Sequence, residues 1–172
     1  KNDATAISAW ALYPDGKLIK LSTFYLDIAK ERRMIGMRGI SHTDQVELMV
    51  EWYKKFRKHM EEYGIQIPEP SRERWCCDGA ALTQDLMLEF EKATRFQTKA
   101  VTDKDIERDN ARLVNSFRSG QLFFLDLPEN NISVEEYETF AYDEENEIPE
   151  GQSDHTIDAD KYATYEYYYD FL

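Results

Sequence analysis

The chain has 172 residues, of which 42% are hydrophobic and 13% aromatic, enough to bury the core of one domain. It has no apolar run of the ~18 residues that a membrane span needs and no apolar signal segment at its start, so we expect a protein with no membrane partner. The formal net charge of −13 argues at first against a nucleic-acid partner, because phosphate contacts depend on Lys and Arg.

The N-terminal part predicts a β-hairpin followed by a basic segment. Residues 4–12 and 18–26 are rich in β-branched and aromatic side chains, with Asp15-Gly16 between them, which is typical of an antiparallel hairpin. Residues 27–42 show only weak periodicity and contain Lys30, Arg32, Arg33 and Arg38. We expect this irregular segment to flank a DNA duplex, although solvation alone accounts for the same charges.

Helical and strand patterns alternate through the rest of the chain. The patterns predict helices over residues 43–63, around 82–90 and over 106–117, strands over 74–78, 98–101 and 122–125, a short helix or strand over 134–140, and a last helix opened by Asp154. Strands that alternate with helices predict an α/β fold, a mixed β-sheet flanked by helices. No linker divides the sequence, so we predict a single domain over residues 1–172.

The most informative stretch is Asp154-His155-Thr156-Ile157-Asp158-Ala159, because a helix brings residues three and four apart onto one face. Asp154, His155 and Asp158 therefore converge. Asp154 also fits the role of a helix N-cap, and a single histidine is more often structural than a ligand. Asp158 stands between Ile157 and Ala159, where an unpaired carboxylate would be unfavourable, so a metal-ligand role is the stronger interpretation there.

Asp78 is the second candidate ligand. It ends an apolar strand and precedes a helix, which is where α/β folds gather their sites. A plain turn before Gly79 explains it equally well, because Asp-Gly is favoured in turns. The neighbouring Cys76 and Cys77 are adjacent and lack the spaced partners of a zinc site.

The negative charge is concentrated near the C-terminus. The net charge is +2 over residues 1–64, −1 over 65–125 and −14 over 126–172. The acidic run over 143–150 is typical of a solvated loop, whereas carboxylates closer to the C-terminus can hold cations, which reverses the local sign. The acidic total therefore does not exclude DNA binding.

Five segments, in order and spacing, resemble the nuclease domain of the large subunit of tailed-phage DNA-packaging terminases. They are residues 2–6, 75–81, 109–125, 135–140 and 154–162, of which the last is the most specific. The resemblance implies a ribonuclease H-like fold that cuts concatemeric double-stranded DNA with two Mg²⁺ or Mn²⁺ ions and little sequence specificity. It places Asp78 and Asp158 among the metal ligands and His155 at the rim of the site, with Asp154 as a further ligand.

The resemblance also sets expectations about partners and missing parts. It implies a terminase ATPase domain, a small terminase subunit and a portal as partners, and the cytoplasm of the phage's host as the location. The family's first catalytic Asp belongs to a strand that we expect upstream of Lys1, as we expect of the ATPase domain, and Asp3 aligns with the turn after that strand. Two alternatives stay open: another ribonuclease H-like nuclease such as a junction resolvase, and a catalytically silent module that docks on the motor or portal.

Overall fold

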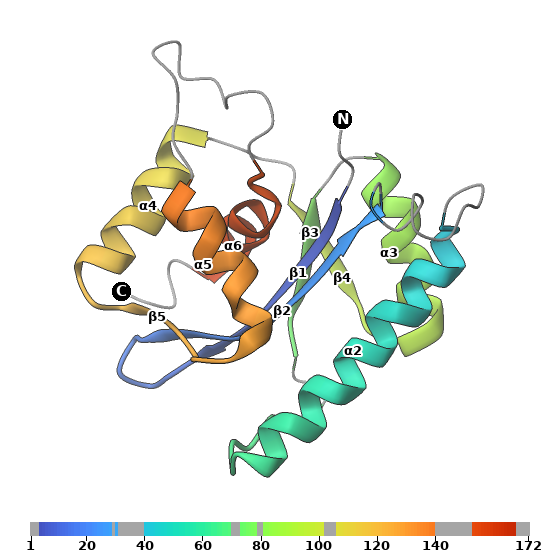
Figure 1. Ribbon diagram of the computed structural model, residues 1–172, viewed down its shortest axis with the longest axis horizontal. Helices are drawn as coiled ribbons and strands as arrows, with labels where there is room; N and C mark the ends of the chain where they lie inside the picture. The colour runs from blue at the N-terminus through green and yellow to red at the C-terminus, as the bar shows by residue number, and fades with distance from the viewer. Residues whose placement is uncertain are drawn as a thin grey trace. The chain divides into compact units, whose positions relative to one another are not determined.

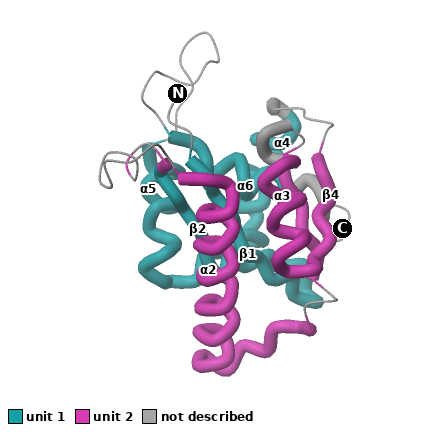
Figure 2. Tube along the Cα trace, turned by 90° about the vertical axis from the view of Figure 1, so that its right-hand side faces the viewer, with its two compact units in different colours: residues 1–27, 105–172 teal, residues 28–104 magenta. Residues whose placement is uncertain are grey.

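The computed structural model describes residues 4–28, 30, 40–69, 73–78, 81–101, 106–139 and 153–167. The chain divides into two compact units, which Figure 2 colours separately. Unit 1 comprises Lys1–Asp27 and Asp105–Leu172, and unit 2 comprises Ile28–Lys104. Each unit combines helices with strands, so the predicted α/β class is confirmed; the single domain stays a prediction.

Unit 1 begins with the predicted hairpin. Strands β1 (Ala4–Leu12) and β2 (Leu18–Asp27) pair antiparallel, with Ala4 opposite Asp27 and Leu12 opposite Leu18. Gly16 has φ 82°, a conformation that glycine adopts without strain, and the register shifts between Ala9 and Trp10, as at a β-bulge. The hairpin is confirmed almost to the residue.

A third strand makes this sheet mixed. Strand β5 (Leu122–Phe124) runs parallel to β2, with Leu18 opposite Leu122, so that the order is β1-β2-β5. The predicted mixed sheet is therefore confirmed in unit 1. None of the strands in the described ranges pairs with the other edge of β1.

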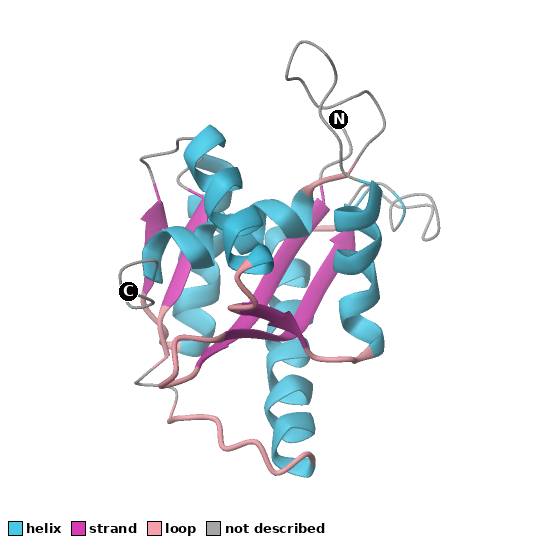
Figure 3. Ribbon diagram, turned by 90° about the vertical axis from the view of Figure 1, so that its left-hand side faces the viewer, coloured by secondary structure: helices cyan, strands magenta, loops and turns pink. Residues whose placement is uncertain are grey.

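Helices of unit 1 pack on this sheet (Figures 1 and 3). They are α4 (Ile106–Arg118), the 3₁₀ turn η2 (Pro128–Asn130), α5 (Asn131–Thr139) and α6 (His155–Tyr167). Leu18, Leu113, Leu122 and Ile157 form a buried cluster that joins α4, α6 and the sheet. The segment over 134–140, left open between helix and strand by its sequence, is helical as far as Thr139.

A buried ion pair lies beside this apolar cluster. Lys20 of β2 donates to both carboxylate oxygens of Asp160 on α6, at 2.9 and 3.0 Å, and both side chains are 0% exposed. Lys20 also donates to Ser133 at 2.7 Å, and Tyr137 donates to Asp160 at 3.1 Å. The pair therefore ties α5 and α6 to the centre of the sheet.

Burial disfavours the charged forms of both Lys20 and Asp160. It lowers the pKa of Lys20 and raises the pKa of Asp160, while the attraction between the two groups opposes both shifts. Because each partner also bonds to a further side chain, Lys20 to Ser133 and Asp160 to Tyr137, protein groups replace much of the lost hydration of the ionic form.

Unit 2 contains α2 (His42–Glu62), β3 (Trp75–Asp78), α3 (Ala81–Thr94) and β4 (Thr98–Val101). Ser41 and Asp44 form a capping box at the start of α2. Strands β3 and β4 are parallel, and α3 makes the crossover between them. None of the described helices in either unit combines the length and apolar character required to cross a membrane.

Removing one partner of the buried pair tests its role in stability. Asp160→Ala is expected to lower the free energy of unfolding by roughly 3–5 kcal/mol, because Lys20 would remain buried without its counter-charge. Glu51→Ala is the matched control: it breaks an exposed pair with Lys55 and is expected to change stability by less than about 1 kcal/mol. Urea unfolding measures both, and equally small losses would contradict the assignment.

Candidate functional site

The first turn of α6 brings three of the predicted site residues together. The Asp158 amide donates to the Asp154 carbonyl at 2.8 Å, so Asp154, His155 and Asp158 occupy one helical turn. All three side chains are partly exposed. The ring of His155 lies 6.2 Å from that of Tyr25, between centroids, which places the turn over the end of strand β2.

Asp154 is the carboxylate with the least compensation in this turn. Within the described part of the chain, its oxygens accept no hydrogen bond and form no ion pair. Its pKa is raised, first by burial and then by the neighbouring charge of Asp158, with Lys161 and His155 opposing the shift. A half-buried, unbonded carboxylate beside another acid is a suitable ligand for a divalent cation.

Asp158 has a different environment from the one its sequence neighbours indicate. Its side chain is 45% exposed and accepts a hydrogen bond from Lys161 at 2.9 Å. The apolar setting that its sequence neighbours Ile157 and Ala159 indicate is therefore not found at the Asp158 side chain. The metal-ligand role of Asp158 stays a prediction, and it requires the hydrogen bond from Lys161 to Asp158 to break.

The buried acid of α6 is Asp160 instead. Asp160 lies three residues after Ile157 and shares its inward face, because helix neighbours are three and four residues apart. The same periodicity, applied to the sequence, identifies Asp160. Lys20 lies two residues after the buried Leu18 on the same strand. Because side chains two residues apart on a strand share a face, the sequence indicates that Lys20 is buried as well.

A second buried acid, Glu136 of α5, holds the beginning of α6. Glu136 is 3% exposed and accepts hydrogen bonds from the Thr156 amide at 2.8 Å, the Thr156 hydroxyl at 2.6 Å and the Ser153 hydroxyl at 2.6 Å. Ser153 also contacts the Tyr25 hydroxyl at 3.3 Å. Nothing in the local sequence pattern distinguishes Glu136 from the exposed Glu135 or Glu138.

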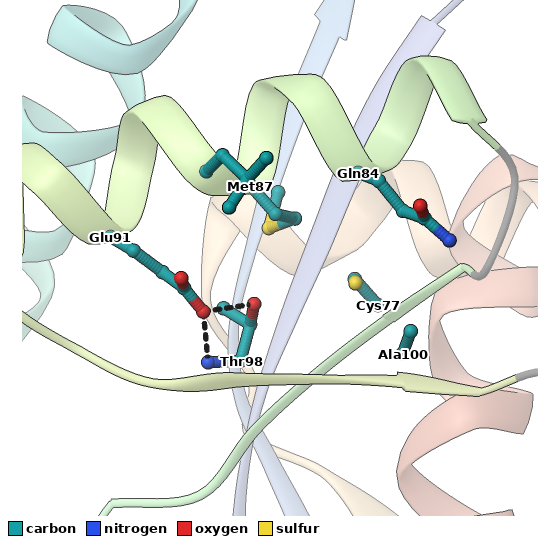
Figure 4. Close-up of a pocket in the computed structure, with 7 residues that line it drawn as sticks. Cys77, Gln84, Met87, Glu91, Thr98 and Ala100 are labelled. Atoms are coloured by element: carbon teal, nitrogen blue, oxygen red, sulfur yellow. Dashed lines mark hydrogen bonds between the residues drawn. The ribbon is translucent and has the colours of Figure 1, made fainter.

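Asp78 lies in unit 2, as the last residue of β3, and is partly exposed. Together with burial, its charge raises the pKa of the adjacent Cys77 thiol. A cavity of about 220 Å³ lies nearby between α3 and the two strands, where Glu91 accepts from the amide and hydroxyl of Thr98 (Figure 4). Asp78 does not line this cavity, so the cavity is not the candidate site.

The remaining predicted residues fall in two groups. Lys30 is exposed, whereas Arg32, Arg33 and Arg38 lie outside the described residues. Asp78 belongs to unit 2 and Asp158 to unit 1, so their predicted meeting at a shared metal pair stays a prediction.

Over the described ranges, no group of three or more His, Cys, Asp and Glu side chains is arranged to hold a metal ion.

The chain was compared with family models, curated proteins and solved structures. No family model matches the chain, and no curated protein matches it. A solved structure of the large terminase from a thermophilic bacteriophage, in complex with ADP, superposes with a TM-score of 0.65 at 19% identity over 94% of this chain. The chain has the fold of part of a phage large terminase. It spans 36% of that terminase's length, and the likeness extends over both units.

Because the pKa of Asp154 is raised, removing its charge is expected to increase the stability of the folded protein by an amount that depends on pH. The folded protein binds a proton at Asp154 more readily than the unfolded chain, so the charged form destabilises folding above the folded pKa, and this penalty disappears below the unfolded value of 3.8. Asp154→Asn, which removes the charge and nearly keeps the size of the side chain, is expected to raise the melting temperature at pH 7.

Thermal melts between pH 7 and pH 4 in a chelating buffer measure this difference. The gain from Asp154→Asn should shrink as the pH falls, and a gain of constant size would contradict the assignment. Asp158→Asn provides the comparison: it breaks the pair with Lys161 and is expected not to raise the melting temperature.

Proposed function

We propose that this chain is the nuclease part of a tailed-phage large terminase, with a ribonuclease H-like fold, and that it hydrolyses phosphodiester bonds of concatemeric double-stranded DNA. The observation that carries the proposal is the structural likeness to the large terminase of the thermophilic bacteriophage over 94% of the chain. The sequence motif at the start of α6, with two carboxylates and a histidine in one turn, supports it independently.

The donor set of unit 1 suits Mg²⁺ or Mn²⁺. Asp154 offers an unbonded carboxylate with a raised pKa, and Asp158 lies in the same turn, so a divalent cation would relieve their mutual repulsion. We propose Asp154 as the principal ligand from unit 1, with Asp158 joining it when Lys161 moves away and His155 at the rim. Asp78 is the proposed ligand from unit 2.

A bound pair of divalent ions supplies a nucleophilic water and stabilises the leaving oxygen of the phosphodiester. In this proposal the carboxylates would hold the ions, and His155 would move a proton at the rim of the site. No feature of the described helices indicates reading of base edges, so we propose cleavage with little sequence preference.

The edge of β1 that pairs with none of the strands in the described ranges bears on how the proposed site is completed. The nine residues of β1, Ala4–Leu12, contain no charge, and an edge without charged side chains is prone to pair with another strand. We propose that an upstream strand, which the resemblance to the large terminases implies, pairs here and brings the first metal-binding Asp. The ATPase domain, small terminase subunit and portal are the proposed partners, in the cytoplasm of the phage's host.

Cleavage of a supercoiled plasmid with Mn²⁺ tests the function. Asp154→Asn and Asp78→Asn are each expected to lower the rate at least roughly 100-fold, since a lost metal ligand removes several kcal/mol of transition-state stabilisation. Asp126→Asn, which changes an exposed acid of unit 1, is the control and should cleave normally.

The assay is run on this chain and on one extended upstream by the predicted strand. Activity restricted to the extended chain would support the open-edge proposal. Absence of cleavage in both would favour the catalytically silent docking module.

The basic segment makes a separate prediction about DNA binding. The double variant Arg32→Glu, Arg33→Glu is expected to weaken binding to all DNA sequences and to reduce the log–log salt slope by about 2, as for two lost phosphate contacts. Lys54→Glu, Lys55→Glu on the exposed surface of α2 is the charge-matched control. Fluorescence anisotropy over a salt series measures both, and equal effects would remove the segment from the proposed interface.

A further inference from the structure

We propose that Glu136 is a positioning residue of the metal site: it holds the first turn of α6 so that the carboxylate of Asp154 is left free for a divalent cation. This inference rests on the proposed function. It assigns a task to a residue of α5 that is not one of the proposed metal ligands.

The hydrogen bonds at the beginning of α6 show which carboxylate caps the helix. An Asp that precedes a helix normally accepts from the backbone amide two or three residues later. For Asp154 the first of these amides is that of Thr156, and it donates to Glu136 at 2.8 Å instead. Glu136 therefore performs the capping that Asp154 would otherwise perform.

The same carboxylate fixes the turn from both sides. One oxygen of Glu136 accepts from the amide and the hydroxyl of Thr156, just inside the helix, while the other accepts from Ser153, just before it. Asp154 and His155 lie between these two anchors in sequence. Since Glu136 is almost fully buried, the anchors hold the turn in one position.

The charges around the first turn of α6 agree with Glu136 as the cap and Asp154 as the ligand. The negative charge of Glu136 is stabilised at the positive end of the α6 dipole. It also adds to the repulsion that Asp154 experiences from Asp158. Because Glu136 is the smallest of the contributions that raise the pKa of Asp154, its charge is expected to matter less to a cation there than its hydrogen bonds do.

Two substitutions separate geometry from charge. Glu136→Ala removes all three hydrogen bonds. Glu136→Gln can keep them, because its carbonyl accepts from Thr156 and its amide donates to the Ser153 hydroxyl, and it removes only the charge. Glu135→Gln, on the exposed side of the same helix, removes one charge without touching α6 and is the matched control.

The experiment combines amide hydrogen exchange at Thr156 with calorimetric titration of Mn²⁺ into the full chain. Glu136→Ala is expected to accelerate exchange and to weaken Mn²⁺ binding about 10- to 100-fold, the range found when residues that orient metal ligands are lost. Glu136→Gln and Glu135→Gln are expected to stay close to the wild type in both measurements.

Each other outcome has a definite meaning. A folded Glu136→Ala chain that binds Mn²⁺ as tightly as the wild type would overturn the inference and leave Glu136 as a structural cap. Equal weakening in Glu136→Ala and Glu136→Gln would overturn it too, since charge rather than position would then matter. No Mn²⁺ binding by the wild type would instead overturn the proposed function, and the inference with it.

A milder pair of variants applies if Glu136→Ala does not fold. Ser153→Ala and Thr156→Val each remove one of the three hydrogen bonds and keep the buried charge. Each is expected to weaken Mn²⁺ binding by less than Glu136→Ala would, and unchanged binding in both would overturn the inference.

Discussion

A lysine and an aspartate that are both fully buried have to face each other, and this constraint fixes how unit 1 is assembled. Lys20 is the third residue of the central strand β2, so Asp160 can reach it only if α6 crosses the sheet at one position and one rotation. Ser133 and Tyr137 add α5 to the same arrangement. Apolar packing of Leu18, Leu113 and Ile157 tolerates small slips of a helix, whereas a buried ion pair does not, because its desolvation is offset only at good geometry.

The rotation set by Asp160 determines what the beginning of α6 presents. With Ile157 and Asp160 turned inward, Asp154 and Asp158 fall on the side that is partly exposed. The inward-facing Thr156 then meets Glu136, and the helix end is satisfied without Asp154. Two buried acids in positions given by packing thus leave a third acid, Asp154, without a hydrogen bond to its carboxylate among the described residues.

Most of the fold was predictable because its signals are local. Segments rich in β-branched and aromatic residues on both sides of Asp15-Gly16 predict the hairpin, and apolar spacing predicts α2, α3 and α4. The site was predictable only in part. The convergence of Asp154 and Asp158 follows from helix geometry, but which acid is buried depends on Lys20, 140 positions away, and the task of Glu136 depends on a helix that packs against α6. Such pairings are set by tertiary contacts, which a single sequence does not contain.

The carboxylates of the acidic C-terminal third differ in the groups that bond to them. Asp160 pairs with a buried ammonium, Glu136 accepts three hydrogen bonds from neutral donors and Asp158 pairs with Lys161, while the Asp154 carboxylate has no such partner among the described residues. Net charge alone treats these four acids as equivalent and argues against a DNA partner. Their environments argue otherwise, because uncompensated carboxylate charge held in a fixed turn attracts divalent cations, and bound cations turn an acidic surface into one that accepts phosphate.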